Sequence, residues 1–400
     1  MPGGVRDILL PGLGRVIRVS GCPEFPSLLE TALPGWRMTV IEGEGPAPDI
    51  RIAGDAPACR QISPNYPQGV THESPVAAVC SVTADLVERY LSLHPDLVGL
   101  HCASVEINGR LVLFPETHRA GKSTLVAALA GGGLRVFGDD VLVLEDGGRG
   151  MALGISPRLR LPLPTPPAVD VALHNYTAAH AAAEDHRYRY LNLPEGQLAR
   201  HGESLPLGAV VLLERDEQLG KPELVPLAPG EGLTRLLRQH FAHDLPSEAL
   251  MERFLPLMRS LPCRLLRYPE PLAAARCLRT SLPGVIDSID KASGAQWEES
   301  PARSTAAPVA IDDRWCVASG LREYELGDER FLIEPSSGAI HRLNGTGHLV
   351  WGLLQEEAMS GREVSELLVE HFPDVSPARI EADVGSLLAE LNDAQLIVSA

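Results

Sequence analysis

The segment that decides the fold is Leu111-Val-Leu-Phe-Pro-Glu-Thr-His-Arg-Ala-Gly-Lys-Ser-Thr124. Its first four residues are apolar and predict a buried strand, and Gly121-Lys-Ser-Thr124 predicts the start of a helix that runs through Ala130. Backbone N–H groups at such a helix N-terminus point toward a bound phosphate, a Lys contacts the terminal phosphates, and a Ser hydroxyl holds Mg²⁺. The residues predicted to bind a nucleoside triphosphate are His118, Arg119, Ala120, Gly121, Lys122, Ser123 and Thr124.

The segment departs at one position from the usual phosphate-loop pattern G-x-x-x-x-G-K-[ST]. Glu116 replaces the first Gly of that pattern. Glycine at this point permits a positive φ and a close approach of the backbone, whereas a carboxylate repels phosphates. Two features can offset this repulsion. His118 and Arg119 supply positive charge within the loop, and the Glu116 side chain can point away from it. The alternative interpretation is an ordinary strand-to-helix turn that contains Gly-Lys-Ser.

Two adjacent carboxylates follow the predicted helix. The segment Leu134-Arg-Val-Phe-Gly-Asp-Asp140 predicts a short strand that ends in Asp139 and Asp140. Beside a phosphate loop, one carboxylate can ligate Mg²⁺ and a second can accept the proton of an attacking hydroxyl. The alternative is a Gly-Asp-Asp surface turn. Upstream, residues 100–110 predict a strand and an Asn-Gly hairpin that lead into the loop strand, with His101 at the start of the first strand.

Composition narrows the classes of partner. The formal net charge of −17 over 400 residues argues against a general nucleic-acid binder, whose phosphate contacts need a basic face. The seven Cys include no C-x-x-C pair, which indicates reduced thiols and a cytoplasmic location. The first residues lack the apolar run of a signal peptide, and no segment reaches the roughly 18 apolar residues of a membrane span. We therefore expect no nucleic-acid partner and no membrane partner.

Periodicity and composition divide the chain into four regions. Residues 1–95 are β-rich, residues 96–283 form an α/β domain, residues 284–312 a linker, and residues 313–400 a separate unit. In the first two regions, strands are expected at 15–19, 38–41, 205–213 and 264–268, helices at 84–93 and 233–261, and an extended proline-rich stretch at 157–167.

The last region has an α+β pattern. Strands are expected at 322–326, 330–334 and 339–343, followed by helices at about 345–357, 360–371 and 376–392. Ser336-Ser-Gly338 supplies the turn between the last two strands. Ser360 and Glu363 have the spacing of a capping box, which predicts the start of the middle helix.

The motifs around the loop resemble a known family. His101-x-Ala-Ser-Val, Asn108-Gly, Gly121-Lys-Ser-Thr-Leu and Gly138-Asp-Asp140 together resemble the catalytic domain of bacterial HPr serine kinase/phosphorylase and its compact relatives. Those relatives include kinases that phosphorylate precursor peptides of lasso-type natural products. The resemblance covers roughly residues 95–280 and implies an α/β P-loop kinase fold of the HPr kinase catalytic type, with the β-rich N-terminal region packed on it. The second signature segment of the bifunctional enzymes is not found, which puts phosphorylase activity and HPr as substrate in doubt.

The same resemblance implies cofactors and residue roles. ATP and Mg²⁺ become the expected ligands, with Lys122 and His101 near the phosphates. Asp139 is then the expected catalytic base, and Ser123 and Asp140 are the expected metal ligands. Arg158 and Arg160 in the proline-rich stretch become candidates for phosphate or substrate contacts, and the alternative for both is an exposed loop.

The last region resembles a second family. Phe331-Leu-Ile-Glu-Pro335, His341-Arg-Leu-Asn-Gly-Thr-Gly-His-Leu-Val-Trp351 and Leu396-Ile-Val398 resemble PqqD, a small peptide chaperone of cofactor and peptide-modification pathways. This resemblance implies a winged-helix-like α+β domain that binds the leader of a precursor peptide. An extended peptide can add a strand to an open sheet edge. The strand implied to accept it comprises Ala339, Ile340, His341, Arg342 and Leu343. The alternative is a module that stabilises the kinase or mediates dimerisation.

Together the two resemblances imply an ATP-dependent kinase that phosphorylates a hydroxyl, expected to be that of Ser, on a ribosomally made precursor peptide. Binding of the leader would raise the effective concentration of the attached core peptide to roughly millimolar values if the linker between them is short and flexible. Two alternatives stay open: a nucleotide-binding peptide chaperone without transferase activity, and a kinase of a small metabolite. The sequence does not indicate an oligomeric state.

Overall fold

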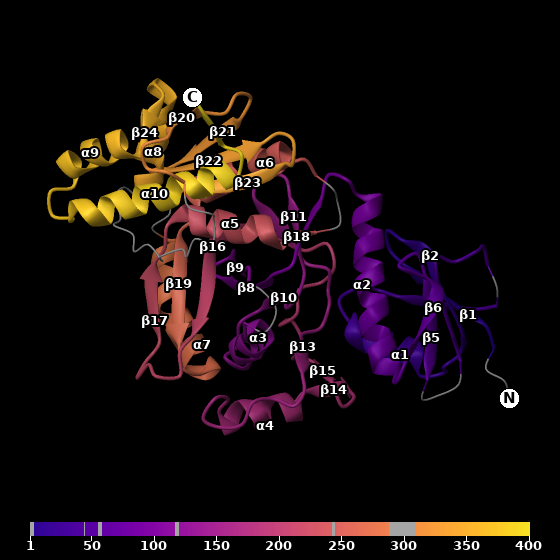
Figure 1. The fold of residues 1–400 in the computed structure, drawn as a ribbon. Coiled ribbons are helices and arrows are strands. Elements are labelled where there is room, and N and C mark those ends of the chain that lie inside the picture. Colours follow the sequence, from indigo (N-terminus) through magenta and orange to yellow (C-terminus); the bar gives the residue numbers. More distant parts are fainter. Residues whose placement is uncertain (1–3, 44, 55–57, 117–119, 242–244, 288–308) are drawn as a thin grey trace. The chain divides into compact units, whose positions relative to one another are not determined.

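A computed structural model describes residues 4–43, 45–54, 58–116, 120–241, 245–287 and 309–400 (Figure 1). The chain divides into two compact units. The first comprises Met1–Leu227, Arg235–Asp244 and Leu261–Gln296, and the second comprises Ala228–Thr234, Leu245–Ser260 and Trp297–Ala400. Residues 228–234 and 245–260, which lie within the range assigned from sequence to the α/β domain, therefore belong to the second unit.

The N-terminal region of the first unit is a sheet with two helices. Its strands are β1 (Arg6–Leu10), β2 (Gly14–Gly21), β3 (Thr39–Glu42), β4 (Ile50–Gly54), β5 (Cys59–Ser63) and β6 (Tyr66–His72), in the order β3-β1-β2-β4-β5-β6, and its helices are α1 (Phe25–Ala32) and α2 (Pro75–Leu93). Helix α2 begins well before the predicted residue 84. Ser74 caps it by accepting a hydrogen bond from the N–H of Ala77 at 3.0 Å, and Pro75 suits the first helical position.

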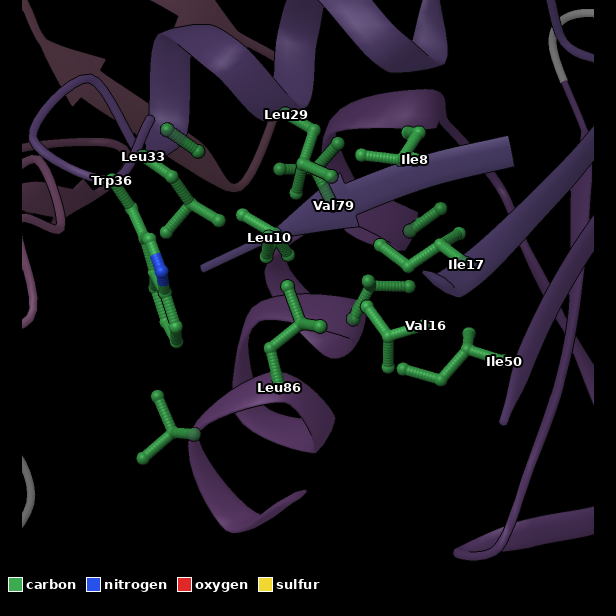
Figure 2. Close-up of a cluster of buried hydrophobic side chains, with 14 of the residues drawn as sticks. Ile8, Leu10, Val16, Ile17, Leu29, Leu33, Trp36, Ile50, Val79 and Leu86 are labelled. Atoms are coloured by element: carbon green, nitrogen blue, oxygen red, sulfur yellow. The ribbon is translucent and has the colours of Figure 1, made fainter. Parts of the chain in front are cut away.

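A single hydrophobic core joins this region to the rest of the first unit. Figure 2 shows Ile8, Leu10, Val16, Ile17, Leu29, Leu33, Trp36, Ile50, Val79 and Leu86 side by side in it. The same cluster includes Val143, Met151 and Tyr190 from the central region. Burial of these apolar side chains is the main stabilising term, so the β-rich region and the central region are expected to fold together.

The central region is built on a mixed sheet. Its strands are β7 (Val98–Leu100), β8 (Ala103–Ile107), β9 (Arg110–Phe114), β10 (Val136–Gly138), β11 (Leu142–Glu145), β12 (Arg149–Met151), β16 (Ser204–Arg215), β17 (Glu223–Pro226), β18 (His240–Phe241) and β19 (Cys263–Tyr268). Strand β16 pairs in parallel with both β9 and β19. Strands β9 and β16 carry runs of buried apolar residues, as strands covered on both faces do, whereas only Cys263, Leu266 and Tyr268 are buried in β19.

Helices pack on this sheet. Helix α3 (Lys122–Gly131) contacts α4 (Val171–Ala179), α7 (Pro271–Ile286) and β8. All of its residues from Leu125 to Ala130 are buried, so it is a core helix rather than an amphipathic surface helix. A small separate sheet has the order β13 (Arg158–Arg160), β15 (Tyr188–Leu191), β14 (Ala181–Glu184), and β13 lies in the stretch expected to be extended.

The helix expected over residues 233–261 is wrong as one element. The structure has α5 (Pro229–Gln239), then β18, which pairs with β7, and then α6 (Ser247–Ser260). Pro246 disfavours the helical conformation of the residue before it, and the pairing of β18 satisfies backbone groups that a helix would otherwise have used. The periodicity of the apolar residues is similar in both helices and does not reveal this break.

The second unit contains the expected α+β pattern. Strands β21 (Arg322–Leu326), β22 (Glu329–Glu334) and β23 (Ala339–Leu343) form one sheet, and helices α8 (Gly345–Glu356), α9 (Gly361–His371) and α10 (Pro377–Asp393) follow. The capping box of Ser360 and Glu363 is confirmed at the start of α9. A second small sheet of β20 (Arg314–Val317), β24 (Met359–Ser360) and β25 (Ile397–Ser399) was not predicted, because its strands are too short to show a period.

Helix α6 belongs to this second unit although it precedes β19 in the sequence. It contacts β21, and the hydroxyl of Ser247 at its start donates a hydrogen bond to the carbonyl of Gly338. The predicted linker 284–312 lies mostly outside the described residues, and α7 extends to Ile286 within it. In the part of the chain that the structure describes, no helix is long and apolar enough to cross a membrane.

Candidate functional site

The phosphate-loop motif lies between β9 and α3. Gly121 is the N-cap residue of α3 and has a φ of +88°, a conformation that favours glycine. A Cβ at this position would also lie 2.8 Å from the Tyr268 hydroxyl. The helix starts at Lys122, and the N–H groups in the first turn of a helix point toward a position that suits an anion. The predicted ligands His118 and Arg119 lie outside the described residues.

Lys122 is folded back onto the loop. Its side chain is buried, and its Nζ donates a hydrogen bond of 2.5 Å to the carbonyl oxygen of Glu116. Burial lowers the pKa of Lys122, and the charges of Asp140 and Asp139 oppose this shift. The ammonium group is therefore bonded to the loop and lies within electrostatic range of the carboxylate pair.

Glu116, which replaces the loop glycine, is buried and bonded to two other elements. Its side chain is 5% exposed, with Oε2 3.3 Å from Nη1 of Arg235 on α5. Its Oε1 accepts a hydrogen bond of 3.0 Å from the N–H of Leu213 on β16. The carboxylate charge is thus opposed by a guanidinium, which answers the objection from repulsion. Sequence reasoning missed Arg235, because nothing in the local pattern links α5 to the loop.

Asp139 is buried at the end of β10. Its Oδ2 accepts a hydrogen bond of 2.8 Å from the N–H of Arg158, and the Ser123 side chain also hydrogen-bonds this carboxylate. Its Oδ1 has no hydrogen-bond partner among the residues that the structure describes. Burial, reinforced by the charge of Asp140, raises the pKa of Asp139 to about 6. The structure therefore brings together Ser123 and the first of the two predicted carboxylates.

Asp140 is more exposed and is held from two sides. Its Oδ1 lies 3.3 Å from Nε2 of His101, and its Oδ2 lies 3.3 Å from Nη2 of Arg158. His101 follows β7, and its backbone N–H donates a hydrogen bond of 2.7 Å to the carbonyl of Gln239 on α5. The predicted residues His101, Asp140 and Arg158 thus form one cluster next to Asp139.

The two arginines of β13 differ. The guanidinium carbon of Arg158 lies 5.0 Å from the ring centroid of Tyr188, and Nη1 of Arg158 contacts the sulfur of Cys80. Arg160, two residues further along the strand, is exposed. The structure therefore brings Arg158, but not Arg160, to the carboxylate pair.

A cavity of about 1040 Å³ opens beside the cluster within the first unit. His101, Asp139, Asp140 and Arg158 line one part of it. Other lining residues come from α2, from the β15 region and from the end of α5, among them Cys80, Asp85, Arg187, Tyr188 and Arg238. Sequence reasoning missed this second wall. The one available signal was Asp85, a charged residue among the apolar positions of α2, which accepts a hydrogen bond of 2.5 Å from Nε2 of Gln61.

In the second unit, the predicted peptide-accepting strand is β23. Within the described residues it pairs only with β22, so it forms an edge of its sheet. Ala339, Ile340, His341 and Arg342 are half-buried and Leu343 is buried. Burial lowers the pKa of His341. Arg342 already pairs with two carboxylates of this unit, those of Glu329 and Glu231, so its side chain has a structural role.

The match to a family model concerns the second unit. A family model described as coenzyme PQQ synthesis protein D (PqqD) matches residues 329–397. This match runs from β22 into β25, and the C-terminal unit contains a PqqD-like domain. No curated protein matches the chain. Among solved structures, "TbiB1 in Complex with the TbiA(beta) Leader Peptide" is similar at 21% identity over 20% of this chain and 93% of that chain, with a TM-score of 0.19.

Proposed function

We propose that the protein is an ATP-dependent kinase that phosphorylates a Ser hydroxyl of a ribosomally made precursor peptide, which its PqqD-like domain recruits through the leader. One observation supports the kinase part above all others. The glycine-capped helix α3 begins with Lys122 and Ser123, and Ser123 hydrogen-bonds the buried carboxylate of Asp139. An anion-binding helix terminus, a lysine and an acid with a raised pKa are the parts that phosphoryl transfer needs.

Asp139 is the proposed general base. A pKa of about 6 makes this carboxylate a better proton acceptor near neutral pH than an ordinary Asp. Its Oδ1 has no hydrogen-bond partner among the described residues, and Asp139 is one of the residues that line the cavity in which an acceptor hydroxyl would bind. Lys122, whose ammonium is bonded to the loop and feels the charges of the carboxylates, would oppose the negative charge that develops on the transferring phosphoryl.

The side chains present also fit Mg²⁺. In kinase sites this cation is held by one or two carboxylates together with the substrate phosphates, and it prefers oxygen ligands. The Ser123 hydroxyl and Asp140 are the proposed ligands, because Ser123 interacts with Asp139 and Asp140 lines the same cavity as Asp139. When bound, the cation would neutralise charge on the phosphates. Arg158 and His101 would keep Asp140 in place through the contacts that they already make.

The proposed leader site is the edge of β23 that pairs with no other strand among the described residues. The match to PqqD supports this assignment, and an edge strand offers unpaired backbone groups to an added strand. We expect Ile340→Asp to weaken binding of the leader to the full chain at least tenfold, which fluorescence anisotropy of a labelled leader would measure. Val398→Asp changes an equally apolar but 47% exposed position on β25 and is the control. Equal affinities for the two variants would remove β23 from the leader site.

A second candidate function is a nucleotide-binding peptide chaperone without transferase activity. The hydrogen bond from Lys122 to Glu116 favours it, because a lysine retained by the loop is not offered to a phosphate. In that case nucleotide would change the affinity for the peptide without being consumed. A kinase of a small metabolite would instead consume ATP in the absence of any peptide.

Mass spectrometry separates these candidates. A precursor encoded next to this gene is incubated with the protein, ATP and Mg²⁺, and the peptide mass is followed. We expect one added phosphate, with the rate reduced at least 100-fold in Lys122→Ala and Asp139→Asn, as for loss of an essential charge or base. Lys221→Ala, an exposed lysine of the same unit, is the control and should not change the rate. Peptide binding without phosphate transfer would overturn the kinase in favour of the chaperone.

A further inference from the structure

We propose that Glu116 and Arg235 are a positioning pair that sets the nucleotide affinity of the phosphate loop. This inference rests on the proposed function, since it concerns the same loop. Glu116 occupies the position at which the usual loop has glycine, and it is buried rather than turned to solvent. A charged residue retained in a buried place needs a compensating partner, and here Arg235 supplies it at 3.3 Å.

Glu116 connects three elements through separate atoms. Its Oε1 accepts the hydrogen bond from Leu213 on β16, its Oε2 pairs with Arg235 on α5, and its backbone carbonyl accepts the hydrogen bond from Lys122 on α3. The side chain therefore fixes the residue to the neighbouring parallel strand, and the main chain of the same residue fixes the lysine. Displacement of Glu116 would move the acceptor that holds the Lys122 ammonium.

Arg235 has a second consequence for the site, through the electrostatic field. The Glu116 carboxylate lies one residue before the loop segment 117–119, so its charge acts on any phosphate bound at the start of α3. With Arg235 in place, the two charges largely cancel at that distance. Without Arg235, an uncompensated buried carboxylate would repel the phosphates, and low dielectric surroundings would strengthen the repulsion.

Helix α5 also supports the other side of the site. The carbonyl of Gln239, one turn after Arg235, accepts the hydrogen bond from the backbone N–H of His101, which contacts Asp140. The second half of α5 is thus bonded both to the loop and to the carboxylate cluster. We assign Arg235 a positioning role, because it reaches the loop through Glu116 and does not itself line the cavity.

The test is a double-mutant cycle of Glu116 and Arg235 in which the affinity for ATP is measured. Arg235→Gln should weaken the binding of ATP at least tenfold, measured by calorimetry with the full chain and Mg²⁺. Glu116→Gln should change it less than threefold, because the amide oxygen can still accept from Leu213 and no buried charge remains. The double variant should bind ATP as Glu116→Gln does. Arg235→Lys, which keeps the positive charge, should recover most of the affinity.

Two controls separate this outcome from simple destabilisation. Arg276→Gln removes another Arg–Glu pair of the first unit, with Glu270, and should leave ATP affinity unchanged. Where transfer occurs, Arg235→Gln should raise KM for ATP and leave KM for the peptide unchanged. ATP affinity of Arg235→Gln equal to that of the native chain, or failure of the double variant to restore it, would overturn the pairing. Binding is measured without turnover, so a chain that binds ATP but transfers no phosphate would refute the kinase and leave this test intact.

Discussion

At the scale of single residues, burial determines the chemistry of the site. Asp139 and Asp140 are neighbours in the sequence, yet one is buried against Ser123 and the other is paired with His101 and Arg158. Their order and their place after a strand could be predicted from Gly138-Asp-Asp140, but their different environments could not. The environment of Asp139 depends on β13, which is brought to it by the tertiary fold.

The raised pKa of Asp139 predicts the pH dependence of the proposed phosphoryl transfer. A carboxylate base is active when deprotonated, so kcat/KM should fall as the pH is lowered through about 6. The measurement is the initial rate of peptide phosphorylation between about pH 5 and 8. An unchanged rate down to about pH 5 would contradict the assignment of Asp139 as the base.

The raised pKa of Asp139 also predicts an effect on stability: the charged form, which the proposed reaction needs, destabilises the fold. The folded chain holds the Asp139 proton more tightly than the unfolded chain, because the pKa of Asp139 rises from 3.8 to about 6 on folding. The contribution of this group to the unfolding free energy is therefore present below pH 3.8 and is lost as the pH rises through about 6. Asp139→Asn should consequently be more stable than the native chain at pH 8, by roughly 1–3 kcal/mol.

Urea unfolding at pH 8 and at about pH 4.5 would measure this difference. The two proteins should differ at pH 8 and converge in acid. Glu217→Gln, an exposed carboxylate in an ion pair with Arg215, is the control and should show no such dependence. Equal stability of Asp139→Asn and the native chain at both pH values would show that burial of the charged Asp139 carboxylate does not destabilise the fold.

At the scale of elements, local signals predicted the second unit well. The strands β21, β22 and β23 lie at or within one residue of their predicted bounds, because each alternates and ends at a turn. The break between α5 and α6 and the short strands β20, β24 and β25 could not be predicted. Their formation depends on partners distant in the sequence, such as β7 for β18.

The capping box of α9 offers a direct test of a local signal. Ser360→Ala removes the oxygen that accepts from the N–H of Glu363, and should lower the unfolding free energy by about 1 kcal/mol. Ser386→Ala is the control, since the hydroxyl of Ser386 bonds the carbonyl of Ala382 inside α10 and does not cap a helix end. Thermal unfolding followed by circular dichroism would compare them. An equal effect of both substitutions would mean that the cap does not stabilise α9.

At the scale of the whole molecule, each of the two units is compact, but each is made of segments that are separate in the sequence. The second unit takes residues 228–234 and 245–260 from the middle of the chain, and within it Glu329 accepts a hydrogen bond of 2.8 Å from the N–H of Gly230. A boundary near residue 312 follows naturally from composition, because residues 284–312 lack periodicity. Composition cannot reveal that α6 packs on β21.

A truncated chain of residues 1–312 should therefore be less stable than the full chain. Helix α6 would lose β21, against which it packs, and part of its apolar face, which includes Met251 and Phe254, would become exposed. We expect a lower melting temperature than that of the full chain and increased binding of a hydrophobic dye. Unchanged melting and dye binding would show that α6 is stable without the C-terminal segment.

The discontinuous make-up of the second unit also determines how its domain could be exchanged with that of a related protein. The two pieces of the middle region, 228–234 and 245–260, bond with Glu329, Arg342 and Gly338 of the PqqD-like unit. A chimera that exchanges only the segment after the linker would join a foreign domain to helices shaped for the native one. Exchange of leader specificity between such proteins would therefore require the transplant of residues 228–234 and 245–260 together with the C-terminal segment, while the second half of α5 stays with the phosphate loop.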